Sequence, residues 1–126
     1  MKAPAPASVL RHTGPALLLD RVERFDGDTL VCTARGDGRW RWPAMLEATA
    51  QAAGLLAGLQ PDGLSNRAVI AEYRDVAIHV HEHVGSVSVH ARLDRRVLHF
   101  WRMRIEADDM DGRVLLAGFV TLAPGV

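Results

Sequence analysis

WPAMLEATAQAAGLLAGLQPDG, residues 42–63, is the stretch of the sequence that decides the fold. It is rich in Ala, Leu and Met, with few β-branched residues and no internal proline over residues 44–59, which predicts a helix there. Pro43 suits the first helical turn, where a missing N–H does no harm, and Pro61 to Gly63 end the helix. Because apolar residues lie on nearly every side of this helix, we expect it to be buried.

Segments with the character of β-strands lie on both sides of this helix. Two precede it, and Asp26 to Asp28 between them form a strong turn signal. Four follow it, several with alternating apolar and polar residues, and Asp94 to Arg96 and Asp108 to Gly112 are interpreted as turns between them. The predicted strands are Leu17–Phe25, Thr29–Ala34, Ala68–Val80, Ser86–Leu93, Val97–Ala107 and Val114–Leu122.

The expected order of elements is therefore β-β-α-β-β-β-β. One antiparallel sheet wrapped around one apolar helix buries every face of that helix, and this α+β arrangement is the hot-dog fold. The alternative is another α+β sandwich with the helix on one open face. Residues 1–10, which carry one Lys and several Ala and Pro, are expected to be a flexible leader, and residues 11–126 a single hot-dog domain.

The composition excludes several classes of function. The 126 residues include 15 basic and 15 acidic side chains, so the charge gives no reason to expect binding to nucleic acid or to an anionic membrane. No segment has the length and flanking charges of a bilayer span, and a cytoplasmic protein is expected. A near-neutral, fairly apolar domain also favours a dimer. Cys32, the single cysteine, lies in an apolar run and is expected to belong to the core.

Glu47 is the main candidate for chemistry, because it lies near the start of a helix that otherwise avoids charge. Gln51 follows four residues later, on the same helical face. A carboxylate in apolar surroundings is unfavourable unless it is hydrogen-bonded or neutralised, and a carboxyl group held there can act as a general acid or base. His12, just before the first strand, is a candidate partner in proton transfer. The alternatives are a Glu exposed at the helix rim and a surface-loop His.

The remaining histidines offer a weaker signal. His79, His81 and His83 alternate, as metal ligands on one face of a strand would. The segment ends in a turn, however, and no carboxylate lies at a useful spacing, so no metal is predicted and a solvated strand face is favoured. His90 and His99 occupy polar positions of strands and are expected to be exposed.

Arginines make the second half of the chain locally basic. A solvated sheet face is the favoured interpretation, and a docking surface for an acidic acyl carrier protein is the alternative. These residues are Arg92, Arg95, Arg96, Arg102 and Arg104.

Two segments resemble a known family, the hot-dog 3-hydroxyacyl-acyl-carrier-protein dehydratases. RHTGPALLLDRVERFDGDTL (residues 11–30) resembles the opening segment of these enzymes, and MLEATAQAAGLLAG (residues 45–58) resembles their central helix. From residue 68 onward the resemblance depends on strand order and on pieces such as RVLLAGFVTLA (residues 113–123). The best match is the divergent branch found with aryl-polyene-type pigment and fatty-acid-like clusters.

The resemblance implies roles for particular residues. Glu47 falls on the family's helix carboxylate, Gln51 on the helix Gln behind it, and His12 on the His of the opening motif. The family's catalytic base is the His of a Gly-His-Phe-Pro segment before the helix, but this chain has GDGRWRWPAM at residues 36–45. Trp40, Trp42 and Pro43 occupy that region and are expected to line the acyl site, with core packing as the alternative for the tryptophans.

Three explanations for the missing His stay open: His12 is the base, a partner subunit supplies it, or the chain is inactive. The resemblance implies a dehydratase of fatty-acid or polyene biosynthesis, acting on a thioester of an acyl carrier protein or CoA. The alternatives are an acyl thioesterase and an inactive acyl-binding subunit. No cofactor is expected beyond the phosphopantetheine or CoA that carries the substrate, and a homodimer or a heterodimer with another hot-dog subunit is expected.

Overall fold

The computed structural model describes residues 17–34, 38–61 and 68–124. The predicted leader, residues 1–10, and His12 lie outside the described residues. Within these ranges, the main elements are one helix and six long strands, with two short strands beside them. In chain order they are β1 (Leu19–Asp26), β2 (Thr29–Ala34), β3 (Arg39–Arg41), α1 (Trp42–Gly58), β4 (Val69–Ile78), β5 (Glu82–Val84), β6 (Val87–Val97), β7 (Phe100–Asp109) and β8 (Val114–Ala123).

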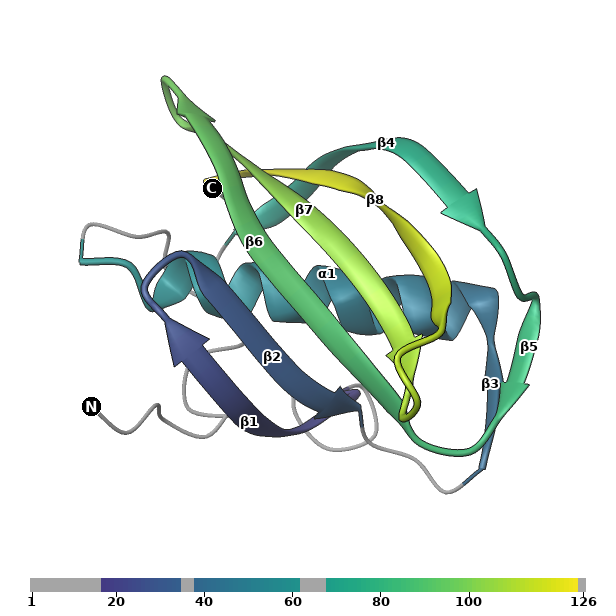
Figure 1. Ribbon diagram of the computed structural model, residues 1–126. Helices are drawn as coiled ribbons and strands as arrows, with labels where there is room; N and C mark the ends of the chain where they lie inside the picture. Colours follow the sequence, from purple (N-terminus) through teal and green to yellow (C-terminus); the bar gives the residue numbers. More distant parts are fainter. Residues whose placement is uncertain (1–16, 35–37, 62–67, 125–126) are drawn as a thin grey trace.

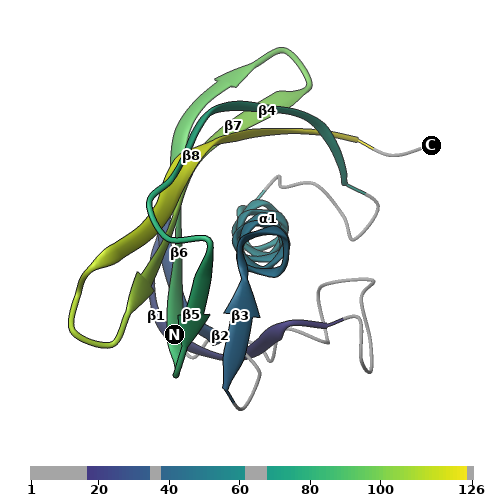
Figure 2. The same ribbon diagram turned by 90° about the vertical axis from the view of Figure 1, so that its right-hand side faces the viewer.

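The six long strands form one sheet in the order β1-β2-β6-β7-β8-β4, and every neighbouring pair is antiparallel. The sheet curls around α1 (Figure 1), and in the view along the helix α1 lies inside the curve of the strands (Figure 2). The hot-dog arrangement and the order of its main elements are therefore confirmed. The sequence did not predict β3 and β5, which pair with each other in a separate two-stranded sheet beside the start of the helix.

The core lies between α1 and the inner face of the sheet. Inward side chains alternate along β6 and β7 as expected, with Val87, Val89, Met103 and Ile105 fully buried. Most of α1 is buried, as its composition predicted. Cys32 is confirmed as a core residue, and burial raises the pKa of its thiol to about 12, so it is an unreactive thiol at neutral pH.

One predicted turn is wrong. Asp94 to Arg96 lie within β6, and the hairpin turns at Leu98 and His99 instead. The register shifts between Leu93 and Arg95, so an irregular residue lets the strand continue through the charged segment. Leu98 adopts a left-handed conformation (φ 56°) that no turn residue signalled, because Leu rarely takes it.

A second turn begins later than predicted. Asp108 was assigned to an acidic turn, but it belongs to β7 and is only 8% exposed. Its strand neighbour His90 was expected to be exposed, and its side chain is instead only one-third exposed. Both differences follow from strand pairing, since Ser88 lies opposite Asp108 and His90 lies opposite Glu106.

The ends of α1 are fixed by its neighbours. The helix begins at Trp42 rather than Ala44, because the Trp42 backbone N–H donates to the carbonyl of His81 at 2.9 Å and Pro43 occupies the first turn. Within the described ranges, no helix combines the length and hydrophobicity needed to cross a membrane.

Candidate functional site

Glu47 and Gln51 form a connected polar pair on the buried helix. The Gln51 amide Nε2 donates to Glu47 Oε1 at 3.3 Å, and Gln51 Oε1 accepts from the Leu18 backbone N–H at 2.8 Å. The Leu18 hydrogen bond fixes the orientation of the amide, so its N–H group must face Glu47. Gln51 is 2% exposed and Glu47 is partly buried.

Tyr73 on β4 is electrostatically coupled to Glu47. Burial, with a smaller contribution from the charge of Glu47, raises the pKa of the Tyr73 phenol to about 12. The phenol therefore stays protonated at neutral pH and is available as a hydrogen-bond donor. Sequence reasoning missed Tyr73, because nothing in the pattern of β4 indicates which of its residues lies near the helix carboxylate.

A hollow of about 290 Å³ opens beside the start of α1. Trp42 and Pro43 line it from the helix, and His81 and Glu82 line it from the segment that follows β4. Pro43 and Glu47 are four residues apart, so they lie on one helical face and the hollow is one turn from the carboxylate along that face.

The predicted site residues separate into two groups. Trp42 and Pro43 border the hollow, whereas Trp40 on β3 is 4% exposed and packs into the core, which was the alternative stated for it. His12 lies outside the described residues. His81 is exposed, as expected of a solvated face, and the pairing of β3 with β5 also brings it beside the start of the helix. Only a prediction of that long-range pairing could have revealed His81 from the sequence.

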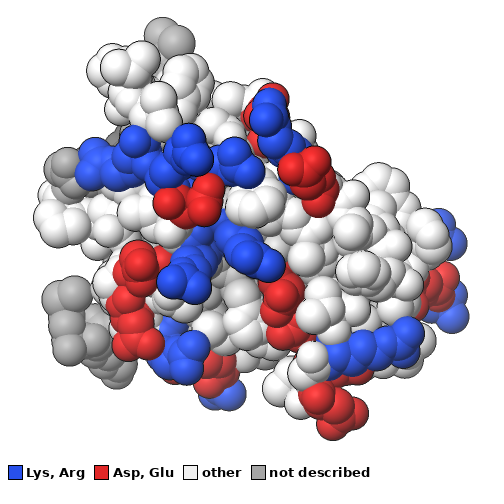
Figure 3. All heavy atoms as spheres, turned by 45° about the horizontal axis from the view of Figure 1, so that its top comes forward, with Lys and Arg blue, Asp and Glu red and all other residues white. Residues whose placement is uncertain are grey.

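The basic residues of β6 and β7 do not form a uniform positive field. Arg102 lies 3.3 Å from Asp94, its guanidinium stacks on Phe119, and Arg96 stacks on Trp101. Figure 3 shows basic and acidic side chains interspersed on this side of the molecule. This mixture fits the solvated sheet face expected from the sequence.

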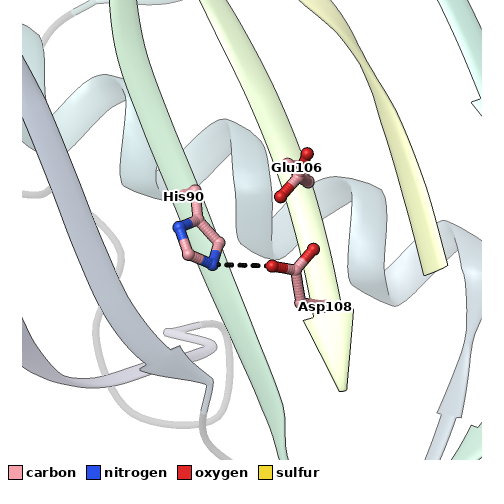
Figure 4. A group of neighbouring side chains, drawn as sticks. All are labelled: His90, Glu106 and Asp108. Atoms are coloured by element: carbon pink, nitrogen blue, oxygen red, sulfur yellow. Dashed lines mark ion pairs between the residues drawn. The ribbon is translucent and has the colours of Figure 1, made fainter. Parts of the chain in front are cut away.

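A second polar group lies on the outer face of the sheet, away from the helix. The potential metal-ligating atoms of His90, Glu106 and Asp108 all lie within 4.8 Å of one another (Figure 4). Burial, then the adjacent Glu106 carboxyl, raises the pKa of Asp108 to about 7. Burial also lowers the pKa of His90, against the opposing effect of Glu106. Among the described residues, this is the one group of three such side chains that comes together, and the alternating histidines at 79, 81 and 83 do not form another.

Replacing Asp108 by Asn is expected to stabilise the fold near neutral pH. The unfolded chain loses the Asp proton near its ordinary pKa of 3.8, whereas the folded protein holds it to about pH 7. The folded state binds more protons between these values, so wild-type stability falls as pH rises through this window. In urea unfolding, Asp108→Asn should exceed the wild type by about 2 kcal/mol at about pH 8 and match it at about pH 4.

Asp111→Asn is the matched control, because Asp111 is exposed in the turn after β7. Its pH profile should follow that of the wild type. If Asp108→Asn also followed the wild type at every pH, the raised pKa of Asp108 would be wrong.

Comparisons with known proteins support the fold. No family model matches this sequence, and the search of curated proteins found no match. Among solved structures, the dehydratase heterocomplex ApeI:P from Xenorhabdus doucetiae is similar over 99% of this chain and 93% of its own, with a TM-score of 0.84 and 18% identity.

Other solved structures, a thioesterase among them, are similar as well. A mutant of thioesterase PA1618 from Pseudomonas aeruginosa matches over 82% of this chain and 78% of its own, with a TM-score of 0.68 and 18% identity. The E. coli PaaI protein from the phenylacetic acid degradation operon matches over 81% and 80%, with a TM-score of 0.68 and 11% identity. At such low identities the similarity establishes the hot-dog fold, which dehydratases and thioesterases share.

Proposed function

We propose that this chain is a dehydratase-like hot-dog protein that acts on a 3-hydroxyacyl thioester carried by phosphopantetheine. The observation that carries the proposal is a Glu47 carboxyl on the central helix, oriented by Gln51 and one turn from a hollow. The motif resemblance of residues 11–30 and 45–58 to the dehydratases supports the choice of substrate, as does the similarity to a dehydratase heterocomplex. We assign the chain to the divergent aryl-polyene-type branch on the same motifs.

The chemistry requires one proton donor and one proton acceptor. A base takes a proton from C2 of the acyl chain, and the electron pair of that C–H bond forms the C2–C3 double bond as the C3–O bond breaks. The hydroxyl leaves as water after it receives the proton of the Glu47 carboxyl. The hydrogen bond that Gln51 Nε2 donates to Glu47 Oε1 restricts the rotation of the carboxyl and so helps to position it.

Two histidines are candidates for the base in this chain. His12 is the one that the family resemblance suggests. His81 is the one that the fold suggests, because it borders the hollow beside Trp42, which belongs to the sequence segment that holds the family's His. His12→Ala and His81→Ala distinguish them, since only loss of the base should lower turnover while leaving binding of the thioester intact.

Arg41 is proposed to bind the phosphate of the phosphopantetheine arm or of CoA. Its exposed side chain borders the hollow, and none of the ion pairs among the described residues uses it, whereas Arg39 pairs with Glu82 at 2.9 Å. Arg41→Ala should lower kcat/KM for the carrier-bound thioester about tenfold, because one charge-assisted hydrogen bond is lost.

A pantetheine thioester without the phosphate provides the comparison for Arg41. Arg41→Ala should leave its kcat/KM unchanged, and Arg104→Ala, on the outer face of β7, should leave both substrates unchanged. An equal loss of kcat/KM with both substrates would show that Arg41 does not act through the phosphate.

We also propose that a second hot-dog subunit pairs with β4. In the described part of the chain β4 pairs only with β8, so its other edge is open. Val69, Ile70 and Tyr73 are exposed apolar residues on this strand, as expected of a strand that another chain covers. A partner there would lie beside Tyr73 and close to Glu47, and it could be a copy of this chain or a homologous subunit.

The deciding experiment measures the mass of a carrier protein loaded with a 3-hydroxyacyl group after incubation with this protein. Loss of about 18 Da means dehydration, and release of the free carrier thiol means hydrolysis, the second candidate, which the thioesterase-like structures favour. The assay is run with the chain alone and with a neighbouring homologue. An unchanged mass in both would overturn catalysis and leave the acyl-binding partner subunit.

A further inference from the structure

Strand pairing brings His90, Glu106 and Asp108 together on the outer face of the sheet. Val89 and Ala107, which precede His90 and Asp108, point inward to the core, so these three side chains point outward. His90 lies directly opposite Glu106 in the ladder between β6 and β7, and Asp108 is its diagonal neighbour. The three side chains are therefore held together by the backbone register rather than by a flexible loop.

The Asp108 carboxylate lacks a partner for one of its oxygens. Oδ2 lies 3.1 Å from His90 Nε2, whereas Oδ1 is buried with no hydrogen-bond partner. Figure 4 shows the Asp108 carboxyl facing the His90 ring, with the Glu106 carboxyl on the same strand completing a triangle of side chains. Because Asp108 is 8% exposed, its carboxyl is shielded from bulk solvent, and a second carboxyl beside it adds repulsion. The group is short of positive charge at the point where its ligand atoms converge.

We propose that His90, Glu106 and Asp108 form a binding site for one divalent transition-metal ion. One imidazole and two carboxylates suit Zn²⁺ and Mn²⁺, and two carboxylate charges neutralise the dipositive ion. Metal–ligand bonds of about 2.0–2.2 Å place ligand atoms roughly 3–4 Å apart. The ligand atoms lie within 4.8 Å of one another, so metal binding requires only a small side-chain movement. Glu106 can supply this movement because its side chain is long, flexible and only half-buried.

The surroundings are compatible with a bound cation. Asp109 adds negative charge near Asp108. The Ser88 hydroxyl lies 3.3 Å from His90 Nε2, and it can rotate to another acceptor when that nitrogen binds a metal. Beyond the effect of burial, the positive charge of Arg24 on β1 lowers the pKa of His90 and so favours its neutral, metal-binding form. A bound ion would fasten β6 to β7 on the side of the sheet opposite α1, so its expected role is structural. This proposal does not depend on the acyl-thioester function.

The test is a zinc titration of the chelator-treated full-length protein by calorimetry, with thermal unfolding measured in parallel. We expect one Zn²⁺ per chain with a dissociation constant in the micromolar range, and a rise in Tm of about 5–10 °C at saturation. His90→Ala and Asp108→Asn should each weaken binding at least about tenfold. The zinc-induced shift is compared within each variant, because Asp108→Asn changes the stability of the metal-free protein.

His79→Ala is the matched control, since it disrupts the alternating histidines and leaves the proposed site intact. Its zinc affinity should equal that of the wild type. Absence of zinc binding would overturn the proposal. A proton shared between Asp108 and Glu106 would then be what reduces the negative charge of the pair. Binding that survives both His90→Ala and Asp108→Asn would place the metal elsewhere and overturn it equally.

Discussion

Glu47→Gln is expected to reduce turnover of a 3-hydroxyacyl-carrier thioester by about a thousandfold, because positioned acid–base groups contribute on this scale. Gln has nearly the shape of Glu, but its amide cannot release a proton to the leaving hydroxyl or activate a water molecule. The prediction therefore applies to dehydration and to hydrolysis alike. Turnover is measured from the mass of the carrier-bound product.

The fold should survive this substitution. The new amide oxygen can accept the same hydrogen bond that Gln51 Nε2 donates to Glu47 Oε1, so the link to Leu18 is kept. The thermal unfolding of Glu47→Gln should differ from that of the wild type by only a few degrees. A loss of activity accompanied by unfolding would not count as support.

Glu72→Gln is the matched control, because it makes the same chemical change at an exposed position of β4. Its turnover should equal that of the wild type. Full activity in Glu47→Gln would exclude Glu47 from the chemistry, and the proposed function would lose the observation on which it rests.

The sequence predicted those features that depend on local pattern. The composition of residues 44–59 predicted the buried helix, and its period predicted the pairing of Glu47 with Gln51. Alternation predicted the inward faces of β6 and β7. The family motifs led to the same carboxylate, although its catalytic role stays a prediction.

Features that depend on long-range pairing were not accessible in this way. His81 reaches the helix start because β5 pairs with β3, two strands of only three residues each, too short for a periodic signal. Asp108 and His90 meet because of one strand register among several that alternation allows. His90 and Glu106 both occupy polar positions of alternating strands, which indicated that they lie on the outer face of the sheet. The register that places them opposite each other could not be derived from either strand alone.

The substitution Gly118→Ala is expected to destabilise the fold by about 2–3 kcal/mol, because it overfills a closely packed position. Gly118 lies on β8 opposite an irregular part of β4, where the register shifts between Arg74 and Ala77. A Cβ atom at Gly118 would lie 2.9 Å from the Cα atom and from Cγ2 of Val76. Since one of these atoms belongs to the backbone, a side-chain rotation cannot relieve the clash, and β4 must move away from β8.

Urea unfolding and thermal unfolding measure the effect, with an expected fall in Tm of roughly 10 °C for a chain of this length. Thr121→Ala on the same strand is the control and should change stability by less than about 1 kcal/mol. Adding Val76→Ala to Gly118→Ala removes the clash with the side chain of Val76 but not the clash with its backbone, so it should restore only part of the stability.

This position also connects the fold to the proposed site. The pairing of β4 with β8 holds Tyr73 opposite Val120 and within the electrostatic influence of Glu47. Displacement of β4 in Gly118→Ala should therefore lower turnover even in the fraction that stays folded, and it should weaken any association through the open edge of β4. If the Gly118→Ala protein were as stable and as active as the wild type, β4 would not be held by the close packing of Val76 on Gly118, and Tyr73 would lose its fixed place beside the carboxylate.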